Sequence, residues 1–216
     1  MTADQCVWRS LQALTVLALI GPLVLVAALV VGWNSSCPPR LPDGQVVELS
    51  QDVLALPGET TVLVLDHVEG DFGLEVEVLP IAGPDSGFDG YGLVFQAQSA
   101  ASYLVLAVGS DGYYAVLRTV GGDEVPLVSW QQFPHVRRGR QVNRLRVACV
   151  GSVCDFYIND EYATTIEQEI RLTGDVGLWV RSFGGEGVTV RCLSARIWCG
   201  GTCVEYRTGE MCYANC

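Results

Sequence analysis

Two acidic residues on one predicted strand have the type and the spacing for acid–base chemistry. From Phe72 to Val78 apolar and acidic residues alternate, which places Glu75 and Glu77 on one face of a strand, about 6.6 Å apart. Pairs of carboxylates that flank a glycosidic bond are the groups with which glycoside hydrolases cleave it. The solvated outer face of a strand explains the pair just as well, so Glu75 and Glu77 are weak catalytic candidates.

A tryptophan near an arginine is the strongest candidate for ligand binding. Along the predicted strand 176–181, apolar residues take one face, and Trp179 and Arg181 take the other. Sugar sites use exposed aromatic rings, flanked by polar side chains, that stack on C–H faces. Tyr103 and Tyr113 are weaker candidates of the same kind. Packing beneath a loop or a second layer is the alternative interpretation of these positions.

The other polar motifs predict no strong site. An acidic loop supplies Asp85 and Asp89 as weak candidate ligands for Ca²⁺, with a plain acidic turn as the alternative. His67 and His135 lie apart from any pattern of a serine or cysteine nucleophile. Trp130, at the end of a predicted strand, is expected in the core.

The cysteines indicate an oxidising compartment. Eight of the nine follow residue 31, and an even number on one side of a membrane segment is typical of disulfide-bonded, exported domains. A four-thiolate zinc site in the last eighteen residues is the alternative for the cysteines there. Beyond one pair, the connectivity stays open among Cys37, Cys192, Cys199, Cys203, Cys212 and Cys216.

That one pair, Cys149–Cys154, follows from a hairpin register. Gly151-Ser152 fits a two-residue turn with glycine first, so Cys149 and Cys154 form a directly opposed pair that a disulfide can bridge. The same register sets Val147 opposite Phe156 and Leu145 opposite Ile158, all on one apolar face.

An apolar run, Leu11–Val31, is long enough to cross a bilayer, because its length as a helix is about 31 Å. It predicts a single-pass transmembrane anchor (11–32) after a cytoplasmic tip (1–10) and before a Pro/Ser-rich stalk (33–44). A cleaved signal peptide is the alternative. Slight positive charge at the tip and the cysteines together predict a cell-membrane protein with a cytoplasmic N-terminus and an extracytoplasmic C-terminal domain.

After the stalk the pattern is β throughout, with a domain at 45–198 and a cysteine-rich tail at 199–216. Short runs rich in Val, Leu and Tyr are separated by Gly, Asp and Asn at the spacing of a sandwich. The net charge of −11 makes nucleic acid an unfavourable partner. The predicted strands are 60–65, 72–79, 92–96, 103–108, 113–120, 127–130, 144–149, 154–159, 176–181 and 188–197.

The order of several segments resembles the concanavalin A-like lectin/glucanase superfamily, in particular its laminin-G-like and family-16 glycoside-hydrolase-like (3-keto-disaccharide hydrolase) domains on bacterial surface proteins. The segments are Gly92-Leu-Val-Phe-Gln96, Tyr103-Leu-Val-Leu-Ala-Val, Asp111-Gly-Tyr-Tyr, Asn143-Arg-Leu-Arg-Val, Asp155-Phe-Tyr-Ile-Asn159 and Gly174-Asp-Val-Gly-Leu-Trp-Val180. The resemblance implies a jelly roll of two antiparallel sheets, with one curved sheet whose concave face binds sugars in many members. The third acid of the glucanase motif is missing, Gln96 stands where relatives often place an arginine, and the cysteine-rich tail departs from the family pattern.

Three functions therefore stand as hypotheses. The first is a membrane-anchored, extracytoplasmic lectin-like module that binds a glycan or an envelope component without catalysis. The second is a glycoside hydrolase of the same superfamily. The third is a structural or protein-interaction ectodomain without a small ligand.

Overall fold

The computed structural model describes residues 46–83, 89–167, 173–199, 203–207 and 210–214, with side chains from Leu49 to Cys199. The chain divides into two compact units, Met1–Pro39 and Arg40–Cys216, and all described residues belong to the second. The predicted anchor, Leu11–Val31, lies outside them, as do the predicted tip and stalk. Within the described residues, no helix has the length and apolarity needed to cross a membrane.

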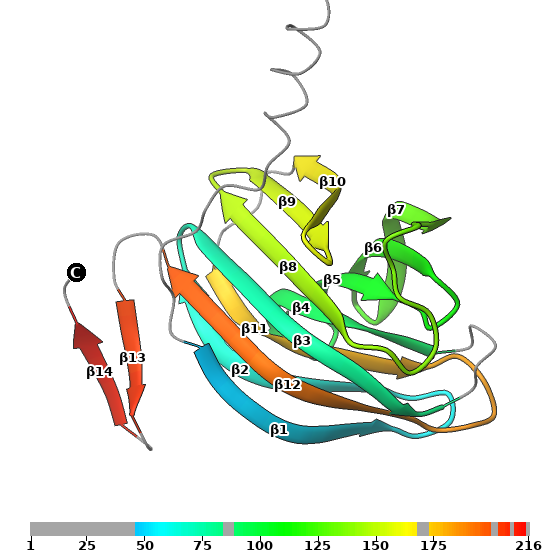
Figure 1. Ribbon diagram of the computed structural model, residues 1–216. Helices are drawn as coiled ribbons and strands as arrows, with labels where there is room; N and C mark the ends of the chain where they lie inside the picture. The colour runs from blue at the N-terminus through cyan, green and yellow to red at the C-terminus, as the bar shows by residue number, and fades with distance from the viewer. Residues whose placement is uncertain (1–45, 84–88, 168–172, 200–202, 208–209, 215–216) are drawn as a thin grey trace, which may run out of the picture. The chain divides into compact units, whose positions relative to one another are not determined.

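Two antiparallel six-stranded sheets pack face to face as a sandwich (Figure 1). Sheet A has the strand order β1-β12-β3-β8-β9-β10, and sheet B has the order β2-β11-β4-β5-β6-β7. This confirms the all-β, two-sheet architecture expected from the sequence. The strands are β1 Val46–Ala55, β2 Thr60–Glu69, β3 Phe72–Ala82, β4 Asp89–Ser99, β5 Ser102–Val108, β6 Tyr113–Val120, β7 Asp123–Gln132, β8 Asn143–Val150, β9 Val153–Ile158, β10 Glu161–Glu167, β11 Thr173–Ser182 and β12 Val188–Cys199, and a separate two-stranded pair joins β13 Cys203–Arg207 to β14 Glu210–Ala214.

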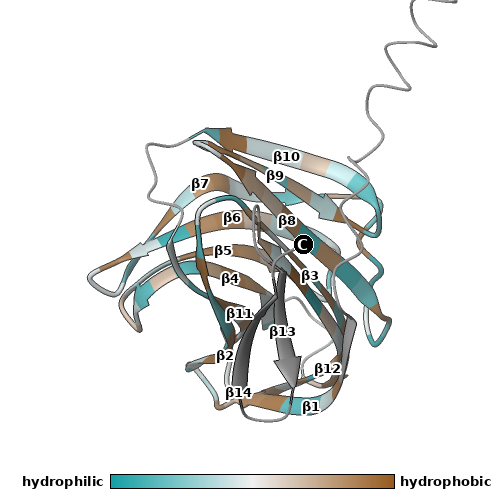
Figure 2. Ribbon diagram, turned by 90° about the vertical axis from the view of Figure 1, so that its left-hand side faces the viewer, coloured by the Kyte–Doolittle hydropathy of each residue, from teal (hydrophilic) through white to brown (hydrophobic). Residues whose placement is uncertain are grey.

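The main core fills the space between the sheets because apolar residues alternate along most strands. In β3, Leu74, Val76 and Val78 are fully buried, whereas Glu75 and Glu77 point to the outer face of sheet A. Apolar residues run along β4, β5 and β6 (Figure 2). At the centre, the ring of Phe95 packs against those of Phe72 and Phe156, which ties the two sheets together.

The β8–β9 hairpin has the predicted register, and its disulfide is present. Cys149 pairs with Cys154, Val147 with Phe156 and Leu145 with Ile158. Gly151 adopts a positive φ of 56°, a conformation that glycine takes without strain. The cross-link therefore fixes a hairpin whose geometry the turn already favours.

A buried asparagine anchors the loop between β7 and β8. The Asn143 side chain is fully buried and donates hydrogen bonds to the hydroxyl of Tyr91 (2.7 Å) and the carbonyl of Arg137 (2.8 Å). Its oxygen accepts hydrogen bonds from the Arg137 amide (2.9 Å) and the Asn159 side chain (2.7 Å). Every hydrogen-bonding group of the amide is thus satisfied, which is the condition for burying it at low cost.

We expect Asn143→Ala to lower the free energy of unfolding by about 2–4 kcal/mol, because it leaves the Tyr91 hydroxyl and the Arg137 amide without their partner. Urea denaturation measures the change. Gln141→Ala, an exposed amide of the same loop, is the matched control. An equal loss in both variants would contradict the anchoring role of Asn143.

Replacing both cysteines of the hairpin by alanine should lower the free energy of unfolding by about 2 kcal/mol, since the cross-link closes a short loop. The measurement compares the variant with the parent chain under non-reducing conditions. Adding a reductant should bring the parent chain to the stability of the variant, and a parent chain that is insensitive to reductant would count against the expectation.

Candidate functional site

The predicted site residues lie on the two outer faces of the sandwich. Trp179, Arg181, Tyr103 and Tyr113 belong to sheet B, and Glu75 and Glu77 belong to sheet A. The sandwich core separates these faces, so the predicted residues do not form one site.

Sheet B curls, so its outer face is concave. Strands β7 and β11 are separated by β4, β5 and β6, and a flat sheet would hold their backbones about 19 Å apart. Arg181 of β11 nevertheless forms an ion pair with Glu124 of β7. Phe183, just after β11, contacts Trp130 of β7, with ring centroids 6.1 Å apart. Contacts of this kind require the sheet to roll β7 toward β11.

The floor of this concave face is filled by the chain's own side chains. A second apolar cluster, separate from the main core, lies here and is almost wholly buried. Glycines in β4 and β11 allow close packing, because a Cβ on Gly92 would meet the Leu106 carbonyl oxygen of the neighbouring strand. The cluster consists of Val94, Tyr103, Val105, Ala107, Ala115, Leu117 and Trp179.

Trp179 faces away from the main core, as the alternation predicts, but it is not exposed. Its side chain is fully buried under Phe183, with ring centroids 6.4 Å apart, and packs over Gly90. The prediction that Trp179 contacts a ligand is therefore wrong for this structure, because the curl of sheet B covers the position. Tyr103 is also buried in the floor, so it too is unavailable to a ligand.

A partly exposed aromatic group remains at one end of the concave face. Trp130 and Phe183 are each 38% exposed and meet edge to face. The Arg181 guanidinium lies 4.9 Å from the centroid of the Phe183 ring. We call Trp130, Phe183 and Arg181 the aromatic rim. Tyr113, on the strand next to β7, is 39% exposed.

Sequence reasoning placed Trp130 in the core, and this is wrong. One extra residue in β7 opposite Ala115 shifts its register against β6, and Trp130 lies on the outer face. Phe183 was missed because it follows the strand in a glycine-rich turn. The alternation beyond Arg181 was the available signal, since Phe183 lies two residues further on the same face.

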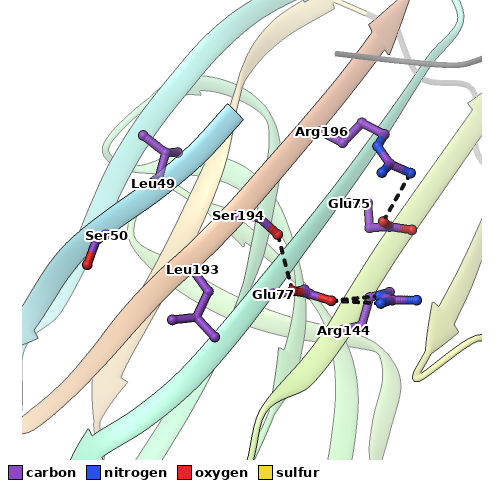
Figure 3. A pocket seen from close by; sticks show the side chains of 8 residues that line it. All are labelled: Leu49, Ser50, Glu75, Glu77, Arg144, Leu193, Ser194 and Arg196. Atoms are coloured by element: carbon purple, nitrogen blue, oxygen red, sulfur yellow. Dashed lines mark hydrogen bonds and ion pairs between the residues drawn. The ribbon is translucent and has the colours of Figure 1, made fainter. Parts of the chain in front are cut away.

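The outer face of sheet A holds Glu75 and Glu77 in a network of arginines (Figure 3). Glu77 accepts hydrogen bonds from Nε and Nη2 of Arg144, at 3.1 and 2.7 Å. Glu75 lies between two arginines, with Nη1 of Arg196 at 3.6 Å and Nη1 of Arg146 at 3.9 Å. Directly opposed strands set these pairs, because Glu75 faces Arg146 on β8 and Arg196 on β12.

A hollow of about 550 Å³ opens beside this network. It forms where β12 carries one extra residue, Leu193, against β3, and where β1 shifts register between Glu48 and Gln51. Its lining comprises Leu49, Ser50, Glu75, Glu77, Arg144, Leu193, Ser194 and Arg196 (Figure 3).

Of the two predicted calcium ligands, Asp85 lies outside the described residues and Asp89 lies within them. Asp89 is buried, and its carboxylate accepts hydrogen bonds from the Ser110 hydroxyl (2.6 Å) and amide (3.3 Å). Burial raises the pKa of Asp89 above its ordinary value. Among the described residues, no three acidic, histidine or cysteine side chains are grouped to hold a metal ion.

Cys192 and Cys199 were each expected in a disulfide with a partner left open, but both are free thiols in the structure. Cys192 is buried beside the bulge of β12, and burial raises its pKa to about 11. Cys37 and Cys216 fall outside the described residues, and only the backbone is described at Cys203 and Cys212, so their pairing stays a prediction.

Comparison with solved structures finds the same two-sheet architecture in proteins described as carbohydrate-binding. The carbohydrate-binding module CBM66 from Bacillus subtilis matches with a TM-score of 0.50 and 14% identity, over 72% of this chain and 91% of that one. The carbohydrate recognition domain of Emp46p in its metal-free form matches with a TM-score of 0.50 and 9% identity, over 68% and 88%. The chain has a lectin-like fold. No family model and no curated protein matches it. At these identities the likeness concerns the architecture alone, and it confirms the fold that the sequence resemblance implied.

Because Trp179 is a packing residue of this lectin-like sandwich, Trp179→Ala should lower the free energy of unfolding by about 3–5 kcal/mol. Trp130→Ala, which removes a partly exposed ring, should cost about 1 kcal/mol or less. Chemical denaturation of both variants measures the difference. Equal costs would contradict the assignment of Trp179 to the floor and Trp130 to the aromatic rim.

Proposed function

We propose that this chain is a membrane-anchored, extracytoplasmic lectin-like module that binds carbohydrate at the aromatic rim without catalysing a reaction. The observation that carries the proposal is the pair Trp130 and Phe183, exposed side by side next to Arg181 in a fold shared with carbohydrate-binding domains.

The aromatic rim has the chemistry that sugars need. Aromatic rings stack on the C–H faces of pyranose units, and a guanidinium donates hydrogen bonds to hydroxyl oxygens. The ion pair with Glu124 and the contact with Phe183 hold Arg181 in one orientation, which reduces the entropy lost on binding. The solved relatives of this fold include proteins described as carbohydrate-binding, which supports the same ligand class here.

The sequence supports the proposed location of the protein at the cell membrane. Leu11–Val31 has the length and apolarity of a single-pass anchor in the cell membrane, with the N-terminus in the cytoplasm. The Cys149–Cys154 disulfide supports an oxidising environment for the sandwich. A stalk of about ten residues would keep the domain close to the membrane surface.

Catalysis has weaker support. Both Glu75 and Glu77 are paired with arginines on the outer face of sheet A, away from the aromatic rim. A second candidate function is a protein-interaction ectodomain without a small ligand. The specific observation in its favour is the concave face of sheet B, whose floor is filled by its own side chains.

The test is a glycan array probed with the full-length chain in detergent. We expect binding to a subset of neutral glycans, and Trp130→Ala should weaken that binding by about tenfold, because one stacking contact is lost. Tyr162→Ala, which removes an exposed aromatic ring from β10, is the matched control and should bind as the parent does. Absence of binding to any glycan would favour the interaction ectodomain.

A further inference from the structure

The outer face of sheet A has more hydrogen-bond donors than its own acceptors satisfy. Four buried nitrogen atoms on this face have no hydrogen-bond acceptor within the described part of the chain: Nε of Arg196, Nε and Nη2 of Arg146, and Nε1 of Trp198. Arg196 and Trp198 lie on β12 and Arg146 lies on β8, the two strands that flank β3 on this face. Of the three side chains, Arg196 lines the hollow described above. Buried donors without acceptors are uncommon in folded proteins, so this face holds donor capacity that its own side chains leave unused.

The acceptor in the middle of this face is loosely held. The carboxylate oxygens of Glu75 lie 3.6 Å from Nη1 of Arg196 and 3.9 Å from Nη1 of Arg146. Both distances are too long for a hydrogen bond. The second carboxylate, Glu77, receives a long hydrogen bond of 3.4 Å from the Ser194 hydroxyl. Unsatisfied donors and a carboxylate with free acceptor capacity therefore occur side by side.

The lining of the hollow contains equal numbers of positive and negative side chains. Arg144 and Arg196 face Glu75 and Glu77, so an anion would meet two carboxylates and a cation would meet two guanidinium groups. A hydroxyl group accepts from arginine and donates to glutamate, and neighbouring hydroxyls on one ring can do both at once. The lining thus matches a neutral ligand with several hydroxyl groups.

The shape of the hollow agrees with this chemistry. Its volume of about 550 Å³ lies within the range of small-ligand sites. Leu49 and Leu193 supply apolar surface for the C–H face of a sugar ring, and Ser50 adds a hydroxyl. We propose that this hollow on sheet A is a second binding site, distinct from the aromatic rim, that takes a neutral polyhydroxylated ligand such as one or two units of an uncharged oligosaccharide.

The indole N–H groups report on the two faces separately. Trp198 lies on the outer face of sheet A, two residues from Arg196, where its ring packs over Gly73. Trp130 lies on the aromatic rim of sheet B. With ¹⁵N-labelled tryptophan in the full-length chain, each indole gives its own NMR signal, and Trp→Phe variants assign them.

The experiment titrates cellotetraose, xylotetraose, maltotetraose and inulin-type fructotetraose, with tetragalacturonate as the anionic comparison. We expect at least one neutral probe to shift the Trp198 signal in a saturable manner. Arg196→Gln should weaken that shift by about tenfold, because a charged hydrogen-bond donor is lost. Arg191→Gln removes the same charge from the same strand, where it pairs with Asp52 instead, and should leave the affinity unchanged.

Ser194→Ala is a second variant for the case in which Arg196→Gln does not fold. It removes only a hydroxyl group and should also weaken ligand binding, as measured by the shift at Trp198. The proposal is overturned if no neutral probe shifts Trp198, if tetragalacturonate alone does, or if the affinity survives both Arg196→Gln and Ser194→Ala. A Trp130 shift without a Trp198 shift would support the proposed function and reject this second site. The reverse result would support this site and reject the aromatic rim.

Discussion

The contact between β7 and β11 is the interaction on which the shape of sheet B and of its candidate site depends. The ion pair of Arg181 with Glu124 and the packing of Trp130 on Phe183 join strands that three others separate in the sheet. Because the sheet must curl to make these contacts, its outer face becomes concave and small or apolar residues fill the floor. The same curl buries Trp179 and leaves Trp130 and Phe183 partly exposed.

Sheet A follows a different physical rule, because its outer face is polar. Acidic and basic side chains lie opposite one another across β12, β3 and β8, so their charges are paired and no apolar floor forms. Regular pairing would give a flat, closed surface, but the extra residue Leu193 displaces β12 against β3 and opens a hollow. A register irregularity, rather than a loop, therefore creates the concave feature on this side of the molecule.

Local pattern was sufficient to predict the fold and one covalent link. Alternation predicted ten of the strands in part or in full, and turn chemistry set the register from which the Cys149–Cys154 disulfide follows. Within the sandwich, β1 and β10 were not identified individually, because exposed edge strands carry polar residues that weaken the alternation. Strands β13 and β14, in the cysteine-rich tail, were not predicted either. Alternation also gave the correct face for Trp179, but burial of that face depends on the curl of six strands. Contacts between β7 and β11 are separated by more than fifty residues, so no local window contains them.

The arginines narrow the chemistry of any ligand. In a chain with a net charge of −11, Arg144, Arg146, Arg181 and Arg196 each lie beside a carboxylate, so the candidate surfaces present paired charges rather than a positive potential. Paired charges attract ions weakly over distance, but they hold donors and acceptors at fixed positions. Hydroxyl groups of a ligand can bind at such fixed positions, because each hydroxyl can accept a hydrogen bond from an arginine and donate one to a carboxylate while remaining uncharged. Both the aromatic rim and the hollow on sheet A are therefore better suited to uncharged carbohydrate than to polyanions, for reasons that rest on side-chain geometry and apply independently to each face.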